Sequence, residues 1–213
     1  MTALVWDAVG ERRFETGVDR GVLYVPDGTV VPWNGLISVA ETLSREVKPY
    51  YIDGIKFLDH HVPGSYAAKL QAFTYPDELD ALIGTLEFAP GVFVHDQGQP
   101  KLFNLSYRTG VGNDLVGLDH GYKVHILYNV LAVPSDVAMS TLADQVAPQA
   151  FEWSLFGTPS QMFGIRPTSH ISLESRTIDA ALLSSIEDLL YGSEDADPAL
   201  PGLVDLLGLV EAA

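Results

Sequence analysis

The sequence contains no cysteine, so disulfide frameworks, thiolate metal sites and cysteine nucleophiles are all excluded, and the redox compartment stays undetermined. It also lacks any run of about 20 apolar residues, so no membrane-spanning helix is predicted. The first residues do not combine a basic start with an apolar run, as a signal peptide would. We therefore expect a protein that is made and used without secretion and has no membrane partner.

Basic residues are few. The chain has 12 Lys and Arg against 28 Asp and Glu, a net charge of −16. Proteins hold nucleic acids mainly by neutralising phosphates with Lys and Arg, so this balance argues against a surface that binds DNA or RNA. No basic residue follows Arg176, whereas acidic residues continue to the end, which makes the C-terminal part a separate electrostatic unit.

Catalytic signatures are also missing. The sequence has no Gly-x-Ser-x-Gly, no phosphate-binding Gly-x-x-x-x-Gly-Lys, no Gly-x-Gly-x-x-Gly after a strand and no His-Glu-x-x-His. Asp59-His60-His61 matches a short phosphoesterase signature, but neighbouring strand residues point to opposite faces and could not share one metal. The same objection applies to His120 and His125. We therefore predict no enzyme activity, no cofactor and no metal ligands.

The length of 213 residues and the hydrophobic content of 47% fit one main domain with a sizeable core. Strand-like segments recur between Gly, Pro and Asp. They are residues 22–25, 55–60, 66–75, 101–108, 122–131, 151–156 and 170–175. The glycine-rich stretch 109–121 is predicted to be a long hairpin loop between two of them.

Two helices are predicted, at 76–83 and at 177–191, and the second ends at Gly192. An acidic, proline-containing linker follows, and then Leu203, Leu206, Leu207 and Val210 form an apolar stripe at helical spacing. We divide the chain into a β domain with its N-terminal segment, residues 1–192, and a linker with a C-terminal arm, residues 193–213. The stripe either docks on an adjacent copy or packs back on its own domain, and we predict the first.

Six segments are similar in sequence, and in the same order, to segments of one protein family: 6–24, 31–36 (VPWNGL), 51–56, 72–78, 105–109 and 121–125. They closely resemble the major tail protein, or tail tube protein, of long non-contractile-tailed bacteriophages, especially those of actinobacterial hosts. The resemblance spans residues 6–192 and stops at the acidic linker.

This resemblance implies a mainly β fold, a sandwich or barrel of the tail-tube type with one flanking helix and extended loops or arms. It implies rings, hexameric in the family, that stack into the tail tube through which the genome passes. The partners implied are other copies of the chain and the terminator, tape measure and distal tail proteins, in a virion tail assembled in the host cytoplasm. The family carries no active site. The alternative is a non-enzymatic β-sandwich that serves as a binding or decoration module of a virion.

The residues fit such an assembly physically. Rings that join sheets edge to edge leave no exposed strand edges, and an acidic lumen would let DNA pass without specific binding. Because high charge opposes association, apolar segments should drive assembly. The candidates for subunit contacts are Trp33, Asn34, Gly35 and Leu36, together with Leu203, Leu206, Leu207 and Val210. An ordinary core position for Trp33 is the alternative.

The charge balance yields a first prediction. The protein should not retard duplex DNA at physiological salt and micromolar concentration, because no basic stripe is available to release counterions. An electrophoretic mobility-shift assay measures this directly. A shifted band under these conditions would overturn the inference that the acidic charge excludes a DNA-binding surface.

Overall fold

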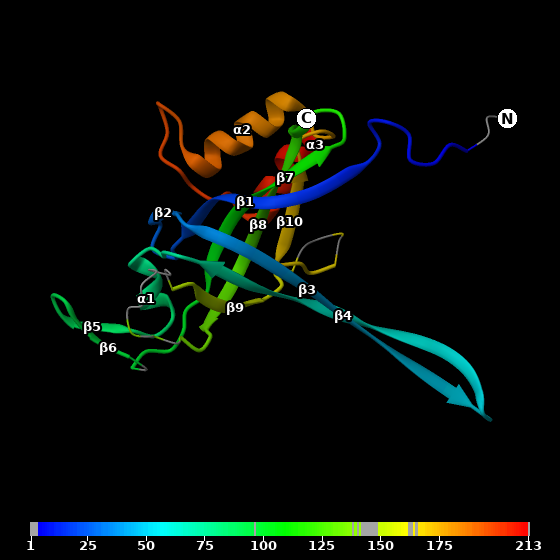
Figure 1. Ribbon diagram of the computed structural model, residues 1–213. Coiled ribbons are helices and arrows are strands. Elements are labelled where there is room, and N and C mark those ends of the chain that lie inside the picture. Colours follow the sequence, from blue (N-terminus) through cyan, green and yellow to red (C-terminus); the bar gives the residue numbers. More distant parts are fainter. Residues whose placement is uncertain are drawn as a thin grey trace.

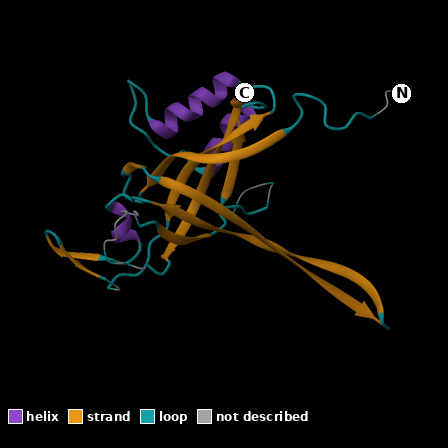
Figure 2. Cartoon of the chain, in the orientation of Figure 1, coloured by secondary structure: helices purple, strands orange, loops and turns teal. Residues whose placement is uncertain are grey.

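The computed structural model describes residues 4–95, 97–137, 139, 141, 149–161, 164 and 166–212. Within these residues the chain is mainly β, as the sequence predicts, and α2 and α3 cover one side of the sheet (Figures 1 and 2). The elements are β1 (Arg13–Tyr24), β2 (Val30–Trp33), β3 (Leu36–Ile52), β4 (Ile55–Ala72), α1 (Glu78–Leu82), β5 (Leu86–Ala89), β6 (Val92–Val94), β7 (Phe103–Asn113), β8 (Gly117–Pro134), β9 (Phe151–Gly157), β10 (His170–Glu174), α2 (Ala180–Tyr191) and α3 (Leu203–Ala212).

The main sheet is antiparallel, in the order β2-β1-β7-β8-β9-β4-β3, and β10 pairs with β8 beside β9. The sheet curls so that β1, which follows the short end strand β2, comes into contact with β3 at the other end of the order. No strand pairing joins them among the described residues. We call the gap between β1 and β3 the seam.

The central strand β8 has two buried faces. Val124, Ile126 and Tyr128 point to the outside of the sheet, where they pack against α2 and α3. Leu127 and Val130 point into the curled sheet and join the inner core. Because side chains alternate along a strand, a strand with both faces covered carries apolar residues on both.

The predicted loop 109–121 is mostly strand, which corrects the sequence interpretation. β7 continues to Asn113 and β8 starts at Gly117, so only three residues form the turn. The glycines serve close packing. A Cβ on Gly112 would lie 2.3 Å from the ring of Phe14 in β1, and one on Gly110 would lie 3.1 Å from the Thr16 carbonyl oxygen. Glycine here makes room for the neighbouring strand.

The β3–β4 hairpin is the largest departure from the predicted elements. The sequence predicts strands at 55–60 and 66–75, whereas the structure has one strand from Ile55 to Ala72 and pairs it with β3, which was not predicted. Asp53 and Gly54 form the connecting turn with φ of 50° and 75°. The hairpin extends far beyond the body of the molecule (Figure 1).

Both predicted helices are present. At the start of α2 the Asp179 carboxylate accepts hydrogen bonds from the backbone of Ala181 and Leu182, and Gly192 ends the helix with φ of 84°. Asp179 is therefore the N-cap that holds this helix in place. None of the helices in the described part of the chain is long and apolar enough to cross a membrane.

The C-terminal arm packs on its own domain, so the predicted docking of Leu203 and Leu206 on another copy is wrong. Both side chains are buried with α2 and β8 in the outer core. The linker doubles back, because the Ala199 amide donates to the Leu189 carbonyl and the Tyr128 hydroxyl to the Pro201 carbonyl. These bonds bring α3 back to the side of the sheet on which α2 packs.

We expect Leu206→Ala to lower the free energy of unfolding by about 2 to 5 kcal/mol, because it opens a cavity under α3. The control is Val204→Ala in the same helix, at a side chain that is 64% exposed; it should change stability by less than about 0.5 kcal/mol. Urea denaturation followed by circular dichroism measures both. Equal stability of the two variants would show that α3 does not belong to the core.

Candidate functional site

Five strands bring polar side chains together inside the curled sheet, next to the seam. They are Glu41 from β3, Tyr66 from β4, Tyr107 from β7, His125 from β8 and His170 from β10. We call this group the seam cluster. It lies among otherwise apolar inner-core residues, so each polar atom in it needs a partner.

Tyr107 stacks on His125, and the His125 and His170 rings lie edge to edge in nearly one plane. The Tyr107 and His125 rings lie 4.7 Å apart with an angle of 4°, and those of His125 and His170 lie 5.3 Å apart with an angle of 18°. Tyr107 and His125 are direct partners across the β7–β8 pair. The strand register therefore sets the stack.

The ring nitrogens and one carboxylate oxygen converge. His125 Nδ1 lies 3.1 Å from His170 Nε2, and Glu41 Oε1 lies 3.4 Å from the first nitrogen and 3.8 Å from the second. The Tyr107 hydroxyl donates a hydrogen bond to the same oxygen of Glu41. Two imidazoles and a carboxylate thus face one point.

The other side of the His125 ring is held by a separate chain of hydrogen bonds. The Thr109 hydroxyl donates to Glu15 Oε1 at 2.7 Å and lies 3.0 Å from His125 Nε2. Since the hydroxyl hydrogen is directed to Glu15, its oxygen accepts from His125 Nε2–H. The remaining nitrogen, Nδ1, is then an acceptor directed at the centre of the cluster.

Burial and charge set the protonation states. Burial alone would raise the pKa of Glu41, but hydrogen bonds from protonated His125 and from Tyr107, together with the charge of protonated His170, outweigh burial at low pH and bring the pKa to about 2. Burial lowers the pKa of His170, against the attraction of Glu41. At neutral pH the cluster therefore holds an ionised carboxylate beside a neutral His170 imidazole.

A cavity of about 390 Å³ leads to the cluster from the seam. Glu41, Tyr107 and His125 form part of its wall, and Val18 and Val39 line it from the two sides of the seam. Among the described residues, Glu41, His125 and His170 are the group whose ligand atoms are close enough to hold one metal ion. The cluster is thus open to solvent at Glu41, whereas His125 is buried and His170 is half-buried.

The sequence interpretation missed this site. It considered His125 only as a metal partner of His120 and rejected that pair, whereas both faces of β8 are buried and His125 points into the inner core. The one signal in the sequence that could have indicated the site is the position of His125 between the apolar residues Val124 and Ile126 of a strand. Glu41 and His170 lie 84 and 45 residues away along the chain, and nothing in the pattern joined them.

Two of the histidines weighed from the sequence, His60 and His120, do not belong to the seam cluster. Asp59 forms an ion pair with Lys56 at 2.7 Å, and His60 is exposed on the hairpin. The side chain of His61 lies outside the described ones. His120 contacts Arg176 at 3.0 Å. The structure does not gather these groups into a site.

Residues 33–36 were predicted as a subunit contact, but Trp33 is only 2% exposed, as its alternative assignment to the core required. Its Nε1 donates to the Thr74 carbonyl at 3.0 Å, and its ring meets that of Trp153 edge to face. Asn34 and Gly35 are exposed, and Leu36 is half-buried. Trp33 is therefore not available as a surface anchor.

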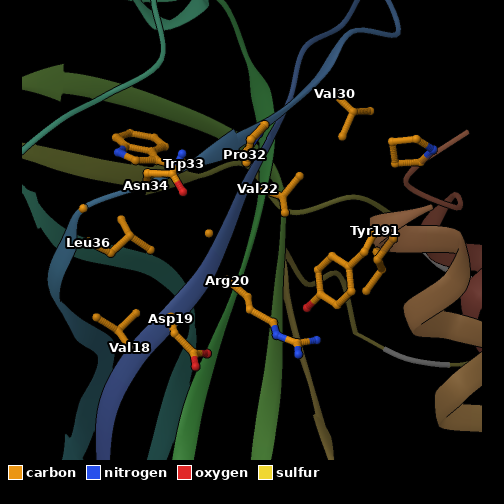
Figure 3. A pocket seen from close by; sticks show the side chains of 14 residues that line it. Val18, Asp19, Arg20, Val22, Val30, Pro32, Trp33, Asn34, Leu36 and Tyr191 are labelled. Carbon is orange, nitrogen blue, oxygen red and sulfur yellow. The ribbon is translucent and has the colours of Figure 1, made fainter. Parts of the chain in front are cut away.

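These four residues line a second cavity, of about 590 Å³, between the start of β3 and the end of α2 (Figure 3). Arg20, which has a left-handed φ of 48° at a bulge in β1, contributes to its wall and lies over the Tyr191 ring at 5.8 Å. The predicted 33–36 segment and the end of α2 thus line the same cavity. Leu207 and Val210 are partly exposed on α3.

No protein-family model matches the chain, and no curated protein matches it significantly. Solved structures to which it is similar include the PVC sheath-tube complex of an extracellular contractile injection system in the extended state, at 16% identity over 80% of this chain and 94% of that chain, with a TM-score of 0.40. The PVC sheath/tube terminator is 15% identical over 80% of this chain and 99% of that chain, with a TM-score of 0.41. The tube-terminating cap of the anti-feeding prophage is 10% identical over 82% and 96%, with a TM-score of 0.41. Similarity at this level carries no conclusion about the function of this chain.

Two tyrosines of the cluster allow a matched test. Tyr107→Phe should lower the free energy of unfolding by about 1.5 to 3 kcal/mol, because it removes a hydrogen bond to an ionised carboxylate. The Tyr66 hydroxyl is buried and has no hydrogen-bond partner among the described residues. Tyr66→Phe should therefore leave stability unchanged or raise it slightly. Denaturation in EDTA-containing buffer compares the two, and equal losses would contradict the assigned bonding.

Proposed function

We propose that this chain is a structural subunit that assembles with copies of itself into the tail tube of a phage or phage-like particle. The resemblance of residues 6–192 to tail tube proteins supports this role. The observation that carries the proposal is the projecting β3–β4 hairpin, whose tip is apolar on both faces.

The hairpin tip, residues 50–58, is exposed throughout in the single chain. Its large apolar side chains are between 45% and 74% exposed: Tyr50, Tyr51, Ile52, Ile55, Phe57 and Leu58. Ile55 and Leu58 are three residues apart on one strand, so they face opposite sides. An apolar group of this size on a monomer marks an interaction surface, and burial on both faces fits an insertion between neighbours.

Free strand edges provide a second kind of contact. β3 pairs with β4 along one edge only, and β2 covers β1 only from Gly21 to Tyr24, among the described residues. Unpaired edges act as templates for another strand. In the proposed ring, each copy offers such an edge to the next, and closed rotational symmetry leaves no edge unused.

The N-terminal segment offers a third contact. Leu4, Val5, Trp6 and Val9 are all more than 70% exposed. Figure 1 shows this segment running away from the body of the molecule. We propose that it packs on an adjacent copy, since burying each such side chain contributes about 1.5 to 3 kcal/mol before ordering costs.

The net charge of −16 suits a lumen that DNA traverses. Carboxylates along the wall repel phosphates, and no release of counterions holds the duplex there. Following the family resemblance, we propose six-membered stacked rings in a non-contractile tail and assembly in the host cytoplasm. The proposed partners are the terminator, tape measure and distal tail proteins, with no catalysis by this chain. Asn34, Gly35, Leu207 and Val210 remain candidate contacts.

The test is to examine the purified, untagged protein by negative-stain electron microscopy and light scattering over a range of salt and protein concentrations. Rings and tubes are the expected species. The double variant Ile55→Lys/Phe57→Lys should abolish tubes without lowering the melting temperature of the monomer, because both side chains are exposed on one face of the hairpin tip. The control, Lys56→Gln, changes the exposed residue between them and should assemble normally.

Two results would count against the proposal. A wild-type protein that stays monomeric under every condition would reject a tube subunit and favour a virion binding or decoration module, with the 590 Å³ cavity as its binding site. Normal tubes from the double variant would show that the hairpin tip is not a contact between copies.

A further inference from the structure

We propose that Glu41, His125 and His170 form a zinc site that ties β3 to β8 and β10 inside the curled sheet. The three ligand atoms come from separate strands of a rigid framework. Two imidazole nitrogens and one carboxylate oxygen are ligands that Zn²⁺ prefers, and three protein ligands leave a fourth position for water. The site does not depend on the proposed function.

The spacing of the ligand atoms fits this ion. A tetrahedral Zn²⁺ with bonds of about 2.0 to 2.1 Å keeps its ligand atoms about 3.3 Å apart. The observed separations are 3.1 Å between the two nitrogens, and 3.4 and 3.8 Å from these to Glu41 Oε1. A shift of a few tenths of an ångström in the Glu41 side chain therefore completes the triangle, and a tilt of the two imidazole rings turns their nitrogens, which face each other head on, toward the ion.

The surroundings of His125 match those of a metal ligand. A ligating histidine usually donates its other ring N–H to an oxygen that fixes the tautomer. His125 donates from Nε2 to Thr109, which is bonded in turn to Glu15. Its Nδ1 is thereby an acceptor facing His170 and Glu41. Without metal, the 3.1 Å contact between the imidazoles requires one proton between them, on Nε2 of His170, and zinc binding would shift that proton to Nδ1 of His170.

The Tyr66 hydroxyl also lies at the centre of the cluster. The residue is only 5% exposed, and its hydroxyl lies near Tyr107 and Glu41 without forming a hydrogen bond of normal geometry to a described residue. Its ring lies 4.9 Å from that of His170. A buried hydroxyl without a partner is costly, and a water molecule on the fourth position of the metal would give it one. The 390 Å³ cavity provides the route for ion and water.

A metal here would compensate for the unpaired seam. β3 ends the order of the sheet and continues outward into the projecting hairpin, so its position decides where the hairpin points. Glu41 lies in β3, whereas His125 lies in the central strand β8. An ion bound by both would anchor the base of the hairpin to the middle of the sheet.

The experiment uses the untagged full chain, stripped with EDTA and then given ZnCl₂. We expect one zinc per chain by elemental analysis and, at a zinc concentration 100 times the dissociation constant, a rise in melting temperature of about 5 to 10 °C. Substituting Co²⁺ should give visible absorption bands of the tetrahedral type. Binding weaker than about 1 mM would overturn the proposal.

Variants locate the ion. Glu41→Gln nearly preserves the shape of the side chain and removes its charge, so it should abolish the cobalt bands and the zinc-dependent shift while circular dichroism stays native. Thr109→Val leaves the three ligands in place and should weaken zinc affinity by about 10- to 100-fold, because it frees the His125 ring. The control, His60→Ala, alters an exposed histidine on the hairpin and should bind as the wild type does.

Each outcome decides the question. Loss of binding in His60→Ala, or full binding in both Glu41→Gln and His170→Ala, would place the metal elsewhere and overturn the proposal. These measurements are made on unassembled protein, so failure to bind zinc leaves the tube proposal standing. Failure to form tubes likewise leaves the zinc site standing.

Discussion

Backbone hydrogen bonds hold β1 to β7 and β3 to β4, but no strand pairing joins β1 to β3, although the curled sheet brings them into contact. Most of the functional features depend on the missing strand pairing at this seam. It leaves the edges of β1 and β3 free, it opens the cavity that reaches Glu41 and His125, and it places the second cavity beside residues 33–36. A closed barrel would have neither the edges for pairing with another copy nor a route to its interior.

The central strand β8 explains why the two sides of the sheet differ. Its outward side chains pack under α2 and α3, so the acidic linker and the C-terminal arm belong to the body of the subunit. Its inward side chains include His125, which could be buried only with partners. Thr109 and His170 lie within hydrogen-bond distance of that ring, Glu41 places its charge beside it, and the Tyr107 ring stacks on it.

The tail-tube proposal and the zinc proposal concern two different properties of one subunit, its contact surface and its rigidity. An assembling protein must present apolar surface, yet the surface must be held at a defined angle if rings are to close. The hairpin tip provides the surface, and its base runs through the seam cluster. Zinc bound by Glu41 would stiffen that base, so the metal would act on assembly through geometry and without contacting another copy.

The sequence by itself determined the mainly β class, most strand cores, helix α2 with its stop at Gly192, and the acidic charge, because these follow from local periodicity and composition. The tertiary structure alone decided the rest. Gly112 reads locally as a loop residue, but it lies under Phe14 in a paired strand. Leu203 and Leu206 form the same apolar stripe in the sequence whether the helix packs on a neighbouring copy or on its own domain, so only the structure distinguishes the two. Glu41, His125 and His170 converge only through the order and curl of the strands, and contacts between residues so far apart in the chain leave no periodic signal within any one segment.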